Sequence, residues 1–171
     1  DNETRFSLFG EYRSGRPYSV TMLDNSGGRG AVFGTVGNLG SMALYVPNLN
    51  DTSKVEFDTP ASETNFNALV SALGLEKYRG RIVPKNSQRS PDFFKVDLHV
   101  SQEIPALVGN AKFKLFADVE NVLNLIDSDW GALRQVSFPY AASLVEVSCI
   151  TDGANACAKY LYSEVEAPNT T

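Results

Sequence analysis

The chain has 171 residues and a net charge of −5, and 43% of its residues are hydrophobic. This composition is too apolar for a disordered segment, and the negative charge argues against nucleic acid as the main partner. The sequence contains no apolar run near the roughly 18 residues of a membrane-spanning helix, whereas a barrel strand needs only about 9–11 residues with one apolar face.

The first predicted element is a strand over residues 5–13. Phe6, Leu8 and Tyr12 alternate with polar residues there, and this period of two is typical of a strand with one apolar face. Glycine and proline in residues 14–18 predict the turn that ends it.

Residues 15–91 show no sustained alternation and are predicted to form one long loop. Within it we expect a single helix over residues 62–73, with Ser62 as its N-cap and Gly74 just after its end. Its apolar stripe consists of Phe66, Leu69, Val70 and Leu73. A helix with one such stripe must pack on another element.

Two strands over residues 93–104 and 111–123 are predicted to form an antiparallel hairpin. Their apolar faces consist of Phe94, Val96, Leu98, Val100, Phe113, Leu115, Ala117 and Val119. Their opposite faces carry Lys95, Asp97, His99, Lys112, Lys114, Asp118 and Glu120. Alternating charges on one sheet face indicate ion pairing rather than paired catalytic carboxylates. His99 is too far along the strand from Asp97 and Ser101 for a triad.

Two last strands are predicted over residues 133–148 and 158–165, the first interrupted at Pro139. Between them lie Cys149 and Cys157, whose spacing is typical of neither a redox motif nor a zinc site. We expect a disulfide in an oxidising compartment, worth roughly 2–3 kcal/mol. Two free structural thiols are the alternative.

The predicted fold is therefore all-β, with antiparallel strands and one short helix in a long loop. One apolar and one charged face suit either a soluble sandwich or an outer-membrane barrel. The connections alternate between long and short, which favours the barrel. Five strands cannot close one, since about eight are needed, so we expect a fragment.

Several strings resemble the C-terminal barrel of TonB-dependent outer-membrane receptors, in their Oar-like branch. They lie in residues 14–19, 78–91, 116–124, 129–131 and 138–140, in the order of that family. Lys85 stands where the family usually has Arg, and the chain ends at Thr171 without the family's terminal aromatic strand.

This resemblance implies part of a plugged up-and-down transmembrane barrel of about 22 strands, in the bacterial outer membrane. The segments 15–91 and 124–132 would be extracellular, and 105–110 and 149–157 periplasmic. It also implies a non-enzymatic role without a cofactor, in uptake of a siderophore, saccharide or peptide. The expected partners are outer-membrane lipid, lipopolysaccharide, and TonB through an N-terminal region that this sequence does not contain.

Candidate ligand-binding residues lie in two places. Arg79, Arg81, Lys85 and Arg89 form a basic run, which suits anionic ligands, although solvated loop charge is the commoner explanation. Asp127 and Asp129 resemble the start of a calcium loop beside Trp130, but the remaining ligands are missing, which favours an ordinary turn. The sequence predicts no catalytic group and no metal site. A soluble secreted β-sandwich binding module, or a passive barrel or adhesin, is the alternative function.

Overall fold

A computed structural model describes residues 2–24, 32, 40–106, 109–151 and 157–170. These residues form strands, one α-helix and two short 3₁₀ helices. The chain divides into two compact units. We call Asp1–Arg16 with Pro91–Gln135 the sheet unit, and Pro17–Ser90 with Val136–Thr171 the core unit.

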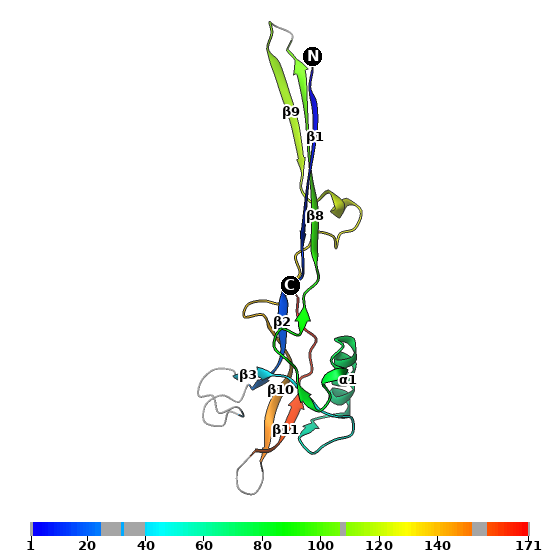
Figure 1. The fold of residues 1–171 in the computed structure, drawn as a ribbon, viewed down its shortest axis with the longest axis vertical. Helices are drawn as coiled ribbons and strands as arrows, with labels where there is room; N and C mark the ends of the chain where they lie inside the picture. Colours follow the sequence, from blue (N-terminus) through cyan, green and yellow to red (C-terminus); the bar gives the residue numbers. More distant parts are fainter. Residues whose placement is uncertain (1, 25–31, 33–39, 107–108, 152–156, 171) are drawn as a thin grey trace. The chain divides into compact units, whose positions relative to one another are not determined.

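The sheet unit contains three long antiparallel strands, β1 (Thr4–Arg13), β8 (Phe93–Pro105) and β9 (Lys112–Val119), with β8 in the middle (Figure 1). Leu8 faces Leu98 on β8, and Val100 faces Ala117 on β9. Because side chains alternate between the faces of a strand, this register places the predicted apolar residues of all three strands on one face. The predicted hairpin of β8 and β9 is confirmed.

The apolar face of the sheet unit is exposed. Phe6 and Leu8 are 70% and 72% exposed, and Phe113 and Leu115 are 63% and 60% exposed. The sixteen hydrophobic residues that form the buried core of the described chain all lie in the core unit. No other described residue of the sheet unit therefore covers this face.

The opposite face carries ion pairs, as predicted, both along β8 and between β8 and β9. Lys112 Nζ lies 3.0 Å from Glu103 Oε2, and Lys95 Nζ lies 2.9 Å from Asp97 Oδ2. His99 contacts Asp118, which is directly opposite on β9, rather than a residue of its own strand. Such exposed pairs contribute only about 0–1 kcal/mol each.

Strand β9 is shorter than the predicted 111–123. Asn121 has a φ of 51°, in the left-handed region, and its N–H donates to Asp97 Oδ1 at 2.8 Å. A 3₁₀ helix over Val122–Leu125 follows. A hydrogen bond to β8 and a positive φ thus end the strand after Val119, the last residue of its predicted apolar face.

The core unit is built on a six-stranded sheet. Five of its strands are hydrogen-bonded to their neighbours in the order β3 (Gly40–Ala43), β2 (Pro17–Asp24), β10 (Ala141–Thr151), β11 (Cys157–Ser163) and β5 (Val55–Phe57). The sixth strand, β7 (Gln88–Arg89), pairs with β2. A separate pair consists of β4 (Tyr45–Val46) and β6 (Arg81–Ile82). A 3₁₀ helix spans Glu76–Tyr78. The pairs β2–β10 and β5–β11 are parallel.

The helix α1 spans Pro60–Ala72 and packs beside β5 and β11. Its N-cap is Thr59 rather than the predicted Ser62, because Thr59 Oγ1 accepts the N–H of Ser62 at 3.1 Å. Gly74 follows the helix with a φ of 63°, as predicted. Phe66 is fully buried, and its ring centroid lies 5.7 Å from that of Tyr162. No helix in the described part of the chain is long and apolar enough to span a bilayer.

The predictions for residues 15–91 and for residues 133–148 are wrong. The segment 15–91 is not an open loop, since its short strands and helix fold together with β10 and β11. The strand predicted at 133–148 begins only at Ala141, and β10 pairs with β2 and β11 rather than with β9. Residues 133–140 are not strand and include the cis Phe138–Pro139 bond.

The physical reason is visible in β10. Its buried residues Ala142 and Val145 lie opposite Val20 and Met22 of β2, and a bulge at Leu144 separates them. The bulge interrupts the alternation, and the parallel partner β2 comes from a distant part of the chain, so the sequence pattern indicated neither the start of β10 nor its neighbour. The strand predicted at 158–165 corresponds to β11, which pairs antiparallel with β10 and ends at Ser163.

Candidate ligand-binding site

The basic run splits into cations with different roles. The Arg79 guanidinium donates to Pro47 O at 3.1 Å and so supports irregular backbone of the core unit. Arg89 belongs to β7 opposite Pro17, and Lys85 is exposed. Arg81 lines a cavity of the core unit that does not include the other three predicted cations. The run is therefore not one electropositive site.

The Asp127–Trp130 loop lies in the sheet unit and forms an ordinary turn. The Asp129 N–H donates to Asp127 Oδ1 at 2.9 Å, and Arg134 Nη2 donates to Asp129 Oδ1 at 2.6 Å. The described residues contain no group of three or more acidic, histidine or cysteine side chains that could hold a metal ion. Both carboxylates already have partners in the turn.

Trp130 is half-exposed beside a small pocket of about 280 Å³ in the sheet unit, which Phe94 and Asp92 also line. The backbone here is tightly packed. Gly131 has a φ of 74°, and a Cβ at this position would clash with the side-chain amide of Asn121. Asn121 Nδ2 donates to Trp130 O at 2.8 Å, so these residues hold the tryptophan in place.

A larger cavity, of about 640 Å³, lies in the core unit, and we call it the core-unit cavity. Neighbouring strand pairs form its walls. Met22 and Met42 face each other across β2 and β3, and Tyr45 faces Ile82 across β4 and β6. Residues 157–160 of β11 contribute another wall. The lining is mainly apolar and aromatic.

Three cations lie at this cavity, and its described lining contains no acidic residue. The Lys159 Nζ lies 2.6 Å from Glu56 Oε1, which neutralises that ammonium. The Lys54 Nζ lies 5.4 Å from the centroid of the Tyr45 ring. Arg81 is exposed and forms no ion pair with any residue that the structure describes. Positive charge therefore remains at Lys54 and Arg81.

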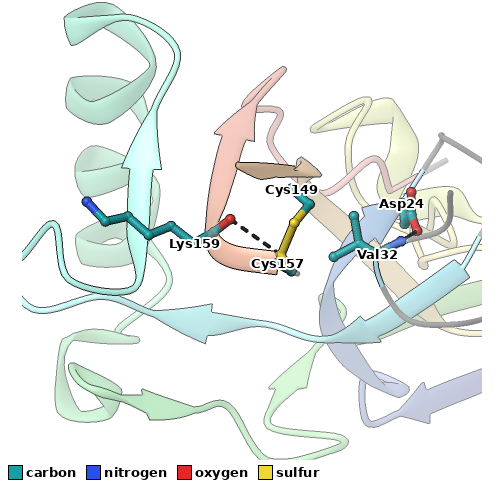
Figure 2. The surroundings of a disulfide bond; sticks show 5 residues. All are labelled: Asp24, Val32, Cys149, Cys157 and Lys159. Carbon is teal, nitrogen blue, oxygen red and sulfur yellow. Dashed lines mark hydrogen bonds between the residues drawn. A yellow bond between two sulfur atoms is a disulfide. The ribbon is translucent and has the colours of Figure 1, made fainter. Parts of the chain in front are cut away.

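The predicted disulfide between Cys149 and Cys157 is confirmed, and it borders the core-unit cavity (Figure 2). It joins β10 to β11, with Cα atoms 5.5 Å apart. The Cys157 Sγ also lies 3.5 Å from Lys159 O. A disulfide sulfur carries no hydrogen, so this is a close contact and not a hydrogen bond. The bond fixes the start of the wall that β11 contributes. Residues 152–156 of the intervening loop lie outside the described residues.

Sequence reasoning found Arg81 and the disulfide but missed the other members of this site. Lys54, Tyr45 and Tyr160 come from three separate segments, and no motif or regular spacing links them. Lys54 lies between Asp51 and Glu56 in the sequence, where a single cation among acidic residues gives no sign of a binding site. The site is a product of the tertiary pairing of β4 with β6 and of β5 with β11.

The chain matches no family model, no curated protein and no solved structure.

Proposed function

We propose that this chain is part of a TonB-dependent outer-membrane receptor. In this proposal the sheet unit contributes β1, β8 and β9 to the wall of a transmembrane barrel, and the core unit lies outside the bilayer and captures a nutrient. The observation that carries the proposal is the uncovered apolar face of the sheet unit.

An exposed apolar face of this length is unfavourable in water and favourable in lipid. The three strands have 10, 13 and 8 residues. A strand that crosses a bilayer needs about 9–11 residues. The ion pairs on the opposite face suit the polar interior of a barrel, where lumen-facing and lipid-facing residues alternate along each strand.

The connections of the sheet unit are unequal at its two ends. Arg13 pairs with Phe93 at one end, and the chain between them forms most of the core unit. At the other end β8 and β9 are joined by residues 106–111, where Ala106 N–H donates to Ala111 O at 2.9 Å, with 107 and 108 outside the described residues. Short periplasmic turns and long extracellular loops are typical of outer-membrane barrels.

This asymmetry changes one detail of the expected topology. Both segments of the core unit leave the sheet unit from the same end, after β1 and after β9. In the proposal the core unit is therefore extracellular, and so is the Cys149–Cys157 bond that was expected in the periplasm. The cell surface is also oxidising, which suits the bond equally well.

The edges of the sheet give the proposal independent support. Strands β1 and β9 each have an outer edge without a partner strand in the described chain. Long open edges promote aggregation unless they are paired or covered, and barrel closure pairs them. Contact with TonB, with lipopolysaccharide and with a plug rests on the resemblance alone.

The test places single tryptophans in a Trp130→Phe background and measures fluorescence quenching by brominated lipid acyl chains in vesicles that contain the refolded chain. Leu8→Trp and Leu115→Trp report on the apolar face, and Ser7→Trp and Lys114→Trp are matched controls on the opposite face. We expect strong quenching of the first pair and weak quenching of the second. Leu49→Trp, in the core unit, should not be quenched.

Equal quenching on the two faces would contradict the proposal, and so would a chain that stays monomeric and soluble without lipid. Those results would favour a soluble binding module in which the apolar face of the sheet unit packs on another sheet. The separate buried core of the core unit is the observation that such a module would build on.

A further inference from the structure

The core-unit cavity combines an apolar floor with an adaptable rim. Met22 is buried in the floor, whereas Met42 and Ile82 at the rim are 50% and 61% exposed. Methionine side chains are flexible and polarisable, and they adapt to ligands of irregular shape. Exposed Met and Ile beside a hollow provide apolar surface that a ligand would bury.

The size and lining of the cavity fit a small molecule. Its volume of about 640 Å³ falls inside the range of roughly 300–1,000 Å³ that is usual for small-molecule sites. Such sites are mostly apolar and aromatic, with a few polar groups that orient the ligand. Tyr45 and Tyr160 supply the aromatic surface here, and Lys54 and Arg81 supply the polar groups.

The positive charge at the cavity favours a negatively charged ligand. Glu56 neutralises Lys159. The Lys54 ammonium lies near the Tyr45 ring and interacts electrostatically with Asp51, which does not line the cavity. The planar guanidinium of Arg81 can bind a carboxylate or phosphate through two parallel hydrogen bonds. Both remaining cations therefore favour an anionic group at the rim, although the whole chain is acidic.

We propose that the core-unit cavity binds a small amphiphilic organic anion. Its carboxylate or phosphate group contacts Arg81 and Lys54, and its apolar or aromatic body lies against Met22, Met42 and the two tyrosines. The inference rests on the proposed uptake function for its biological meaning, and it narrows the nutrient from the siderophore, saccharide and peptide classes to one chemical type.

Calorimetric titration of the full chain with 2-naphthoate tests the inference, and neutral 2-naphthamide serves as the matched probe. We expect 2-naphthoate to bind at least about tenfold more tightly, a difference of roughly 1.4 kcal/mol. Added salt should weaken its binding, because salt screens charges near the surface. Equal affinity for the two probes would overturn the inference, and so would the absence of 2-naphthoate binding to folded chain.

Variants then locate the site. Arg81→Gln should weaken binding of 2-naphthoate about tenfold and leave that of 2-naphthamide unchanged. Lys85→Gln removes a nearby exposed cation that does not line the cavity, and it should change neither affinity by more than about twofold. Equal losses in the two variants would overturn the inference, since they would indicate diffuse charge attraction. A retained thermal unfolding midpoint shows that each variant is folded.

Failure of the binding experiment can be distinguished from failure of the lipid-quenching experiment. Failed binding with positive quenching on the apolar face would remove this ligand site and leave the receptor proposal intact. Selective binding of 2-naphthoate by a chain that does not enter lipid would leave the ligand site intact and remove the membrane proposal.

Discussion

The two units of this protein contain similar hydrophobic residues, which the sheet unit exposes and the core unit buries. In the sheet unit, the strands expose their apolar face. Most of the exposed large hydrophobic residues of the described chain belong to the sheet unit. In the core unit, short strands and one helix bury a common cluster, and Leu44, Phe66 and Tyr162 are fully buried. Side-chain hydrophobicity therefore does not determine burial. Burial depends on whether another element packs on the face of the strands, as α1 does beside β5 and β11.

The largest expected difference between the units concerns aromatic truncation. Phe66→Ala should destabilise the core unit by about 3–5 kcal/mol, because it removes a fully buried ring and leaves a cavity. Phe113→Ala, on the exposed face of the sheet unit, should leave unfolding of the core unit unchanged. Denaturant titration measures both effects. Similar losses would show that the sheet unit's apolar face is buried in solution.

Removal of the disulfide should affect the core unit alone. The Cys149→Ser, Cys157→Ser double variant should lose roughly 2–3 kcal/mol, because the bond restricts the unfolded chain. The thermal unfolding midpoint measures the change. Reductant should lower the midpoint of the parent protein and not that of the double variant. An identical response in the two proteins would show that the bond is absent in solution.

A smaller effect is expected for the buried hydroxyl of Tyr162. This group donates to Tyr45 O at 2.9 Å, and burial raises the pKa of the phenol. Tyr162→Phe should cost about 1 kcal/mol, since the ring remains while one hydrogen bond is lost. Exposed Tyr12→Phe, in the sheet unit, is the matched control and should leave core-unit unfolding unchanged. Equal shifts in denaturant midpoint would contradict the assignment of the buried core to the core unit alone.

The smallest expected effect depends on pH. Partial burial raises the pKa of Glu146 above 4.5, and Glu164 and Glu166 raise it further. A carboxyl group with a raised pKa binds its proton more tightly in the folded state. The core unit therefore loses stability as the pH rises from below 4.5 through the raised pKa. Glu146→Gln should raise the unfolding midpoint at pH 8 and not at pH 4. The reverse order would refute this sign.

Local features of the chain were predictable because they depend on near neighbours. The faces of β1, β8 and β9 follow from alternation, and the helix α1 follows from its stripe and from Gly74. The N-cap is Thr59 and not the predicted Ser62, because the exact end of a helix depends on a single hydrogen bond. The Cys149–Cys157 bond was predictable from proximity along the chain.

The candidate site was predictable only in part. Arg81 was visible in a basic run, but that run gave no reason to separate it from Lys85 or Arg79. The separation depends on where each side chain lies, because Arg79 supports Pro47 O whereas Arg81 lines the core-unit cavity. Lys54 and Tyr160 reach the same cavity through the parallel pair β5–β11.

The sequence by itself determined an all-β chain, its one helix, its disulfide and the apolar and charged faces of the sheet unit, since each follows from the period of side chains or from short-range spacing. Only the tertiary structure decided that residues 17–90 and 136–171 share one core, and that β10 is separate from β9. Parallel and long-range pairing leaves no periodic signal of its own, because alternation along a strand shows which side chains share a face but not which strand lies beside it.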